Sequence, residues 1–370
     1  MTEFRRMKIA HVVDSMEVGG AETLVRQMCQ LQREQGHEPE VYAIAALGPL
    51  GEQMRAEGFR VQANVGRHQI DSSLHFSRIF RSSRPDVAHL HNPTAAMYAA
   101  PVARLAGVPS IVSTRHSLVA PPRNLTMERK YRVAAMFCDW IVGICEATAN
   151  NIKDAGSAPD RKIVTVYNGC VPIAAPPEDQ FPAKEGFTLL FAGRLEAVKN
   201  LQFLLSAFRD AVAQVPEMRL WIVGDGTERS RLEFATDQLG VRPFVTFWGQ
   251  QMDVARFFAA ADAFVMSSVS EGLPMSLLQA LSVRLPAVVT DVGGMAEVVK
   301  LAQSGIAVPP GDVEGMTGAL VRVATRADER EVFANNAQRA FDAHFTLPVM
   351  VQKYSDLYRN TPRARRRWGK

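Results

Sequence analysis

The sequence predicts an α/β protein built from two domains, each with its own parallel sheet. Short apolar runs typical of buried strands alternate along the chain with segments whose apolar residues recur at helical spacing. A chain of 370 residues is also long for a single hydrophobic core. A proline-rich stretch without periodicity, residues 169–182, divides the alternation into two halves. These observations predict strand–helix–strand units with right-handed crossovers on either side of a linker.

In the first half, an apolar strand at 8–13 runs into a turn that contains Gly19 and Gly20. Paired glycines between a strand and a helix let a ligand approach the backbone closely. The helix that follows has apolar residues every three or four positions, which is typical of one buried face. Further strands are predicted at 40–45, 87–91, 110–114, 140–143 and 163–167.

The second half places charged residues in the turns after two of its strands. Arg194 and Lys199 follow the first strand, and Glu271 lies between the fourth strand and a helix that begins near Pro274. In open α/β sheets ligands bind at the carboxyl ends of the strands, where helix N-termini favour phosphate groups. An arginine fork and a lysine point charge suit a diphosphate, with two solvated surface charges as the alternative. The strands of this half are predicted at 188–192, 220–223, 245–247, 263–266, 287–290 and 305–308.

Among the histidines that occupy or follow predicted strands of the first half, His116, His89 and His91 are the candidates for a functional role. His116 lies just after the strand at 110–114, and this position favours a functional role over the structural role usual for a single histidine. His89 and His91 alternate on one strand and therefore share a face, which leaves metal binding open, although no third ligand is evident. In the second half, Gly224-Asp225-Gly226 argues against a nicotinamide cofactor, because Arg229 stands where the dinucleotide fingerprint has its third glycine.

The composition is that of an ordinary globular protein, with 47% hydrophobic and 22% charged residues. Its four cysteines form no C-x-x-C pair, which favours reduced structural cysteines in the cytoplasm. The apolar run near the start is too short for a signal peptide, and the longest apolar stretch, 133–145, is too short to span a bilayer. We therefore expect a cytoplasmic protein.

The formal net charge of +4 is unevenly placed along the chain. Residues 359–370 hold six basic residues and no acid, so the rest of the chain sums to −2. A solvated, disordered tail is the first expectation, and contact with anionic lipid headgroups is the alternative, at about 1 kcal/mol per basic residue. Nucleic-acid binding is disfavoured because no basic stripe with interleaved aromatics occurs elsewhere. The lipid alternative depends on Arg363, Arg365, Arg366 and Arg367.

Over nearly its whole length the chain resembles the retaining nucleotide-sugar glycosyltransferases of the GT-B fold, specifically glycosyltransferase family 4, also called glycosyl transferases group 1. Each motif alone is weak, but their order along the chain is strong support. The motifs are Gly19-Gly20-Ala21-Glu22, His116, Asn168-Gly169, Phe191-Ala192-Gly193-Arg194 with Lys199-Asn200, Val223-Gly224-Asp225-Gly226, Phe247-Trp248-Gly249, Ser267, Glu271-Gly272-Leu273-Pro274, and Asp291-Val292-Gly293-Gly294 with Glu297.

The resemblance implies two Rossmann-like domains that face each other across a cleft and close around the donor. Arg194 and Lys199 would hold the donor diphosphate, Glu271 would contact sugar hydroxyls, and His116 would face the reacting carbon. No cofactor and no metal would be needed, in agreement with the absence of any D-x-D triplet. The remaining donor-binding positions would be Gly19, Gly20, Gly193, Gly224, Trp248, Gly249, Gly272, Leu273, Pro274, Met275 and Gln279.

Gln279 is a departure from the family pattern, which usually has a second glutamate eight residues after the first. We expect the amide of Gln279 still to meet the nucleotide ribose, with reduced donor affinity, because neutral hydrogen bonds are roughly half as strong as charge-assisted ones.

The expected organisation is an acceptor-side domain at 1–171, a linker at 172–184, a donor-binding domain at 185–347, a terminal helix at 348–360 that packs back on the first domain, and a basic tail at 361–370. A basic cluster in the first domain is expected either to approach a membrane or lipid diphosphate, or to be an ordinary solvated helix face. The cluster comprises Arg115, Arg123, Arg129, Lys130 and Arg132.

The favoured function is the metal-independent transfer of a hexose-type sugar, with retention, from a UDP-sugar to a saccharide or lipid-linked acceptor. Bacterial polysaccharide or glycoconjugate synthesis at the cytoplasmic face of the membrane, as a peripheral protein, is the expected setting. The alternatives are a non-catalytic partner subunit that binds sugar nucleotides and a sugar-nucleotide epimerase of similar fold.

Overall fold

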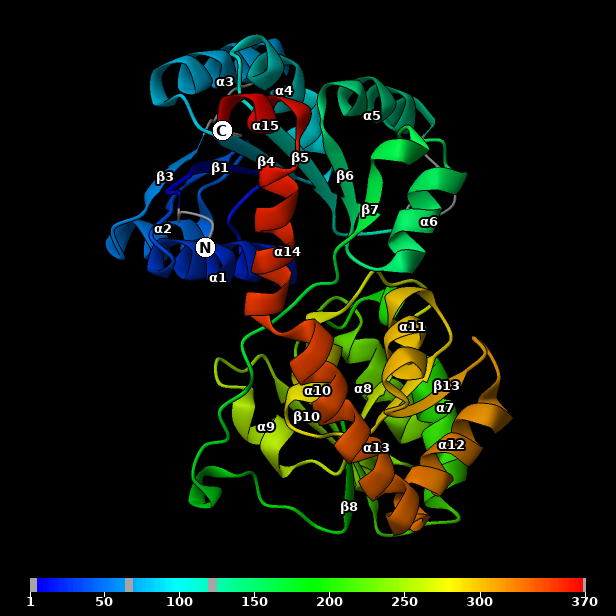
Figure 1. Ribbon diagram of the computed structural model, residues 1–370. Helices are drawn as coiled ribbons and strands as arrows, with labels where there is room; N and C mark the ends of the chain where they lie inside the picture. The colour runs from blue at the N-terminus through cyan, green and yellow to red at the C-terminus, as the bar shows by residue number, and fades with distance from the viewer. Residues whose placement is uncertain (1–4, 64–68, 119–124, 369–370) are drawn as a thin grey trace. The chain divides into compact units, whose positions relative to one another are not determined.

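The computed structural model describes residues 5–63, 69–118 and 125–368. The chain forms two compact units, one of Met1–Gly169 with Leu347–Lys370 and one of Cys170–Thr346. We call them unit 1 and unit 2. Both are α/β layers in which helices cover a parallel sheet (Figure 1), so the predicted fold class is confirmed.

The sheet of unit 1 has seven parallel strands in the order β3-β2-β1-β4-β5-β6-β7. Its central strands are buried along nearly their whole length, because helices cover both faces of the sheet. The strands are β1 (Lys8–Val13), β2 (Glu38–Ala43), β3 (Arg60–Ala63), β4 (Val87–His91), β5 (Ser110–Arg115), β6 (Trp140–Gly143) and β7 (Ile163–Thr165).

The helices of unit 1 include α4, whose buried face consists of five alanines. These small side chains let α3 and α5 pack closely against α4, and Phe76 of α3 and Tyr131 of α5 belong to the same core cluster as the alanines. The helices are α1 (Gly20–Glu34), α2 (Gly48–Ala56), α3 (Gln69–Ser83), α4 (Asn92–Leu105), α5 (Leu125–Phe137), α6 (Glu146–Asp154), α14 (Leu347–Arg359) and α15 (Pro362–Trp368).

The sheet of unit 2 has six parallel strands in the order β10-β9-β8-β11-β12-β13. They are β8 (Phe187–Ala192), β9 (Met218–Val223), β10 (Val245–Gly249), β11 (Ala263–Met266), β12 (Ala287–Thr290) and β13 (Gly305–Val308). The helices are α7 (Leu201–Val212), α8 (Arg229–Gln238), α9 (Ala255–Ala260), α10 (Met275–Ser282), α11 (Gly293–Ala302), α12 (Val313–Thr325) and α13 (Ala327–Ala340).

Some element boundaries differ from the predictions. The second strand runs over Glu38–Ala43 rather than 40–45, and the strand predicted at 163–167 ends at Thr165. β3 was not predicted, because only one of its four residues, Val61, is buried, so it shows no apolar run. The polar linker region contains one short turn of 3₁₀ helix, Glu178–Gln180, and Cys170 forms a parallel bridge with Thr346.

The expectation of a disordered basic tail is wrong for its described part. Residues Pro362–Trp368 form α15, which is anchored on unit 1 by two fully buried residues, Thr361 and Ala364. The Thr361 hydroxyl donates to the carbonyl of Pro109 at 3.2 Å. The arginines of α15 stay exposed, so the charge pattern that suggested disorder belongs to the outer face of a packed helix.

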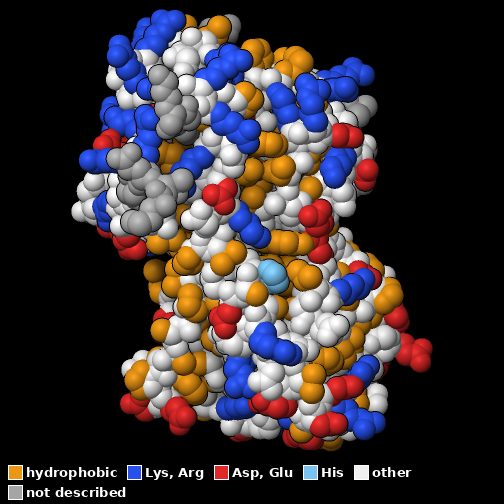
Figure 2. Space-filling model, viewed as in Figure 1, with side chains coloured by type: hydrophobic (Ala, Val, Ile, Leu, Met, Phe, Trp, Pro, Cys, Tyr) orange, Lys and Arg blue, Asp and Glu red, His pale blue; other side chains and the backbone are white. Residues whose placement is uncertain are grey.

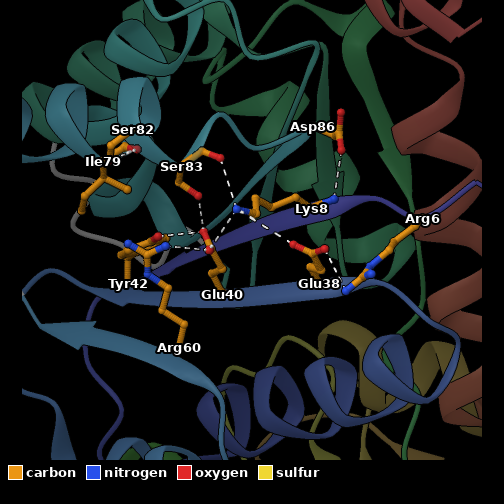
Figure 3. A network of polar contacts seen from close by, with 10 residues as sticks. All are labelled: Arg6, Lys8, Glu38, Glu40, Tyr42, Arg60, Ile79, Ser82, Ser83 and Asp86. Carbon is orange, nitrogen blue, oxygen red and sulfur yellow. Dashed lines mark hydrogen bonds and ion pairs between the residues drawn. The ribbon is translucent and has the colours of Figure 1, made fainter.

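A polar network occupies the amino ends of β1 and β2 (Figure 3). At its centre the buried carboxylate of Glu40 accepts a hydrogen bond from Arg60 at 3.1 Å and one from the Tyr42 hydroxyl at 2.8 Å. The Lys8 ammonium lies 3.6 Å from the same carboxylate. Two cations thus balance this acid, as burial of a charge requires, at the sheet edge opposite the carboxyl ends of the strands.

Candidate active site

In unit 2, Lys199 and Glu271 form an ion pair between the loops that follow β8 and β11. The Ser268 hydroxyl donates to the same carboxylate at 3.1 Å. The two side chains are 15% and 16% exposed, which leaves both accessible to a ligand while most of their length is held by protein. The pair therefore places a cation and an acid together at the carboxyl edge of the sheet.

The backbone of these two loops is joined as well. The Ser267 hydroxyl donates to the carbonyl oxygens of Lys199 at 2.9 Å and Asn200 at 3.2 Å. The amide of Val269 donates to the carbonyl of Val198 at 2.9 Å. Because these bonds link the two loops directly, the positions of Lys199 and Glu271 are fixed relative to each other before any ligand binds.

Gly224 lies in the glycine-rich turn after β9, at a position where a side chain would not fit. Its φ is 131°, and a Cβ at this position would lie 2.0 Å from the carbonyl oxygen of Gly193. Its amide donates to the carbonyl of Gly249 at 2.8 Å, so the turns after β8, β9 and β10 pack against one another. Only glycine fits this close approach, which gives the motif a packing role in this site.

Trp248 and Gly249 end β10 beside an aromatic cluster. The Trp248 ring packs edge-on against Phe257, with centroids 5.0 Å apart, and against Trp221 at 5.9 Å. The indole Nε1 is buried and has no hydrogen-bond partner among the described residues. The segment thus presents a rigid backbone next to the turn of Gly224.

The segment after Glu271 leads into two helix N-termini at the same sheet edge. Leu273 and Pro274 are buried, and α10 begins at Met275, with Pro274 in the capping position rather than inside the first turn. The amide of Gly294, at the start of α11, donates to the carbonyl of Gly272 at 2.7 Å. The free N–H groups of helix N-termini carry partial positive charge and favour anions.

The side chains of Arg194 and Gln279 make no hydrogen bond or ion pair with the residues of this site within the described part of the chain. Arg194 is exposed in the loop after β8, and its guanidinium has no ion-pair partner among the described residues. Gln279 is half-buried on α10, and its side-chain amide makes no hydrogen bond within the described part of the chain. Both side chains are therefore free to meet a ligand.

In unit 1, Gly19 caps the N-terminus of α1, and Gly20 is the first residue of that helix. A Cβ on Gly19 would lie 2.3 Å from the carboxylate Oε2 of Glu22. The absence of a side chain thus lets Glu22 fold back over the start of the helix and keeps the backbone accessible.

His116 lies at one end of a series of side-chain hydrogen bonds that runs through the interior of unit 1. Its Nε2 lies 3.0 Å from Nδ1 of His91, and Nε2 of His91 lies 3.0 Å from Nδ1 of His11. At the other end of the series, Nε2 of His11 lies 2.8 Å from Oε1 of Gln32 on α1. Burial lowers the pKa of His116 and of His11 to about 4, and it lowers the pKa of His91 well below the usual value. These imidazoles are therefore neutral at pH 7.

In the structure His11 lies beside His89 and His91. It was not identified from the sequence as the third histidine of this group. It lies on β1, directly opposite His89 of β4, and ring nitrogens of the three residues lie within 4.8 Å of one another. All six of these ring nitrogens are already hydrogen-bonded, those of His89 to Thr114 at 2.7 Å and to Tyr358 at 2.7 Å. The donor set therefore does not fit a metal ion, which needs free lone pairs.

Comparison with known proteins now places the chain in a family. Residues 18–172 match the model of Glycosyltransferase Family 4, and residues 176–340 match that of Glycosyl transferases group 1. The chain belongs to the family 4 glycosyltransferases. It is therefore a glycosyltransferase, as the sequence motifs predicted.

Two curated relatives of this glycosyltransferase act on lipid-linked acceptors according to their names. The UDP-Gal:alpha-D-GlcNAc-diphosphoundecaprenol alpha-1,3-galactosyltransferase of Escherichia coli is 26% identical over 306 residues, or 78% of each chain. The phosphatidyl-myo-inositol mannosyltransferase of Mycolicibacterium smegmatis is 26% identical over 82% of this chain and 81% of its own.

The solved structure of HepE from Anabaena in complex with UDP superposes on this glycosyltransferase with a TM-score of 0.84. The alignment covers 95% of this chain and 99% of HepE at 19% identity. The likeness shows the fold, two Rossmann-like parallel-sheet domains of the GT-B type.

Sequence reasoning missed Asn92, which supports His116 in this glycosyltransferase, and the nearby Asp14. Asn92 Oδ1 accepts from the amide of His116 at 3.2 Å, and the φ of Asn92 is 71°, a left-handed conformation that is uncommon outside glycine. Asp14 lies near Asn92 and Thr94, and burial raises its pKa to about 6. Both residues directly follow central strands, β1 and β4, and that position was the signal available in the sequence.

The basic cluster of the first domain needs a correction. Arg115 is buried and forms a two-bond ion pair with Glu128, at 2.9 and 2.7 Å, so it is no part of a basic surface. Arg123 lies outside the described residues. Arg129, Lys130 and Arg132 are exposed on α5. No helix within the described part of the glycosyltransferase is both long and apolar enough to cross a membrane.

Proposed function

We propose that this glycosyltransferase transfers a hexose-type sugar from a UDP-sugar to a saccharide or lipid-linked acceptor, with retention of configuration and without a metal ion. The observation that carries the proposal is the Lys199–Glu271 pair at the carboxyl edge of the unit 2 sheet, beside the N-termini of α10 and α11. The uridine preference is supported by the names of the Escherichia coli relative and of the HepE complexes with UDP and UDP-glucose.

In this mechanism unit 2 handles the charge of the donor. Negative charge grows on the diphosphate as the bond to the sugar breaks, and Arg194, Lys199 and the helix N–H groups stabilise it. Glu271 accepts hydrogen bonds from sugar hydroxyls. Main-chain groups of residues 272–275 support the sugar and phosphate, and the segment of Trp248 and Gly249 supports the base.

Two side-chain cations can balance a diphosphate, which is the role of a divalent ion in a metal-dependent transferase. We therefore expect transfer to continue undiminished in excess EDTA. Loss of activity that Mg²⁺ or Mn²⁺ restores would contradict this part of the proposal.

Unit 1 contributes the groups around the sugar and the acceptor in this proposal. Gly19 and Gly20 complete the diphosphate site, and His116 faces the reacting carbon. Exposed Arg129, Lys130 and Arg132 on α5 adjoin exposed Val133 and Met136, a mixed basic and apolar face that suits a lipid-linked acceptor at an anionic membrane surface.

The decisive experiment combines a binding screen with product analysis. Thermal shifts against UDP-, GDP- and ADP-sugars should identify a UDP-sugar as the stabilising ligand, because a ligand that binds the native state raises its stability. NMR of the product made from that donor should show an α-linkage from an α-linked donor. A product of inverted configuration would overturn retention, and release of an altered nucleotide sugar without acceptor would favour the epimerase alternative.

Gln279 provides a separate test of the ribose contact. If its amide meets the ribose, Gln279→Ala should weaken UDP binding several-fold, and Gln279→Glu should strengthen it because a carboxylate makes the stronger hydrogen bond. Unchanged affinity in both variants would show that residue 279 does not touch the nucleotide.

A further inference from the structure

The interior of unit 1 contains a continuous line of neutral hydrogen-bonding side chains, of which the proposed reaction uses only the last, His116. It runs from Gln32 on α1 through His11 on β1 and His91 on β4 to His116 after β5. Gln32, His11 and His91 are buried, and only His116 reaches the surface. Burying so many polar groups is costly unless each is satisfied, so the line itself calls for an explanation.

A line of neutral imidazoles has only two consistent proton arrangements. Each neutral ring offers one N–H donor and one acceptor nitrogen, so the role of the first ring determines the roles of all that follow. The amide oxygen of Gln32 can only accept, so Nε2 of His11 donates to it at 2.8 Å. Nδ1 of His11 must then accept from Nε2 of His91, and Nδ1 of His91 from Nε2 of His116.

The nitrogen of the same amide has no competing contact. Nε2 of Gln32 is buried and has no hydrogen-bond partner among the described residues. Tyr358 on α14 lies near Gln32, and burial raises the pKa of its phenol well above the usual value. The direction of the line therefore rests on the bond between Nε2 of His11 and Oε1 of Gln32.

Tyr358 is also hydrogen-bonded to His89. Its hydroxyl lies 2.7 Å from Nδ1 of His89, whose Nε2 lies 2.7 Å from the Thr114 hydroxyl. Thr114 in turn lies 3.0 Å from the Tyr354 hydroxyl. Reversing the Gln32 amide would aim its N–H groups at His11 and its oxygen at Tyr358, and every proton in the line to His116 would have to move.

We propose that Gln32, His11 and His91 are positioning residues that hold His116 with its proton on Nε2, so that Nδ1 accepts a hydrogen bond from a hydroxyl of the donor sugar. Nδ1 of His116 has no partner among the described residues, which leaves it available to a ligand. The sugar contact rests on the proposed function, whereas the proton arrangement does not. This arrangement favours the binding of a sugar with a hydroxyl group at this position. A sugar that lacks the hydroxyl binds more weakly.

The proton arrangement can be read directly by NMR of the full-length protein labelled with ¹⁵N-histidine. His116→Asn identifies the His116 signals. We expect His116 to carry its proton on Nε2 and none on Nδ1. A proton on Nδ1, or one tightly bound zinc ion per chain in the purified protein, would overturn the proposal.

The matched variants are Gln32→Met and Gln30→Met, which make the same change on the same helix, the second at a residue that contacts Glu57 rather than the histidines. Gln32→Met should leave His116 as a mixture of two tautomers, while Gln30→Met should preserve one. A single unchanged tautomer in a folded Gln32→Met protein would overturn the positioning role.

The sugar contact is tested with donors that each lack one hydroxyl. Loss of one particular hydroxyl should weaken binding about tenfold in the unmodified protein, and Gln32→Met should remove most of that discrimination. Equal responses of both proteins to every deoxygenated donor would overturn the contact. If no nucleotide sugar binds at all, the proposed function fails, and the NMR result still decides the proton arrangement.

Discussion

The two units differ in the way they arrange polar groups at the carboxyl ends of their strands. Unit 2 uses ionised side chains, Lys199 paired with Glu271, on loops that remain partly exposed. Unit 1 uses neutral imidazoles, buried in line behind His116. Under the proposed reaction the ionised site of unit 2 suits a charged diphosphate, whereas the neutral line of unit 1 suits an uncharged hydroxyl group.

The units also differ in overall charge. Unit 1 has 27 Lys and Arg residues against 17 Asp and Glu, a formal net charge of +10, whereas unit 2 has 15 against 21, or −6. Figure 2 shows Lys and Arg side chains spread over the visible face of unit 1. The value of −2 for the chain without its tail is the sum of two opposite charges, +4 on the rest of unit 1 and −6 on unit 2. Even without the six basic residues after position 358, unit 1 keeps a charge of +4.

The largest expected effect concerns the charged site. Lys199→Met should lower kcat about 100-fold or more, since losing one group that stabilises transition-state charge typically costs this much. Lys300→Met is the matched control, because Lys300 forms an exposed ion pair with Asp291 in the same unit. Steady-state rates at saturating donor measure both. If kcat falls less than threefold in Lys199→Met, the charged site of unit 2 does not stabilise the transition state as proposed.

A second prediction tests whether the charged site depends on glycine packing. Gly224→Ala should lower the free energy of unfolding by about 3 kcal/mol, through a Cβ that meets the Gly193 carbonyl and an unfavourable backbone angle. Gly240→Ala is the control, because its φ is also positive but no atom lies within 4 Å of the added Cβ. Urea unfolding should show a loss of only about 1 kcal/mol for this control.

A third prediction uses the low pKa of the buried histidines. The unfolded chain takes up protons below about pH 6.5, but folded His11 and His116 do so only near pH 4. Unit 1 should therefore lose stability as the pH falls from 6.5 to 4, by about 1.4 kcal/mol per pH unit for each such histidine. Asp14, whose raised pKa has the opposite sign, offsets about one of them between pH 6 and 4.

The other groups around these histidines are uncharged, namely Gln32 and Cys29 on α1, Thr114 on β5, and Tyr354 and Tyr358 on α14. Amide exchange at pH 7 and pH 5, corrected for intrinsic rates, should show that β1 and β4 lose more protection than β8 and β11. Equal losses in the two sheets would mean that the buried line does not govern the acid sensitivity of unit 1.

A smaller effect tests the basic surface. Arg129→Glu with Lys130→Glu should weaken binding to anionic vesicles at low ionic strength, at about 1 kcal/mol per charge removed. The matched change on unit 2, Arg322→Glu with Arg326→Glu, should leave vesicle binding unchanged, since that unit is acidic overall. Equal binding by all three proteins would remove the membrane part of the proposal.

The sequence was sufficient to predict the charged site but not the neutral one. Lys199 and Glu271 follow apolar strands, and the rule that ligands bind at strand carboxyl ends is enough to single them out. The histidine line depends on strand order. His11 and His89 become neighbours only because β1 pairs with β4, and Gln32 and Tyr358 reach them from helices more than 300 residues apart in sequence. No local pattern carries that information.

Surface assignments failed for a related reason. Arg115 looks like one of a run of basic residues, yet Glu128, thirteen positions later, faces it inside unit 1. The arginines of α15 suggested disorder because their charge is visible in the sequence, while the burial of Ala364 between them is not.

The most direct test of the central claim is calorimetric titration of UDP and of UMP, in EDTA, into the unmodified protein and the Arg194→Met/Lys199→Met double variant. The two cations are proposed to bind the second phosphate without a metal. The unmodified protein should therefore bind UDP at least tenfold more tightly than UMP, and the variant should bind both nucleotides alike. An unchanged preference for UDP in the variant, or a preference that appears only when Mg²⁺ is added, would contradict the account.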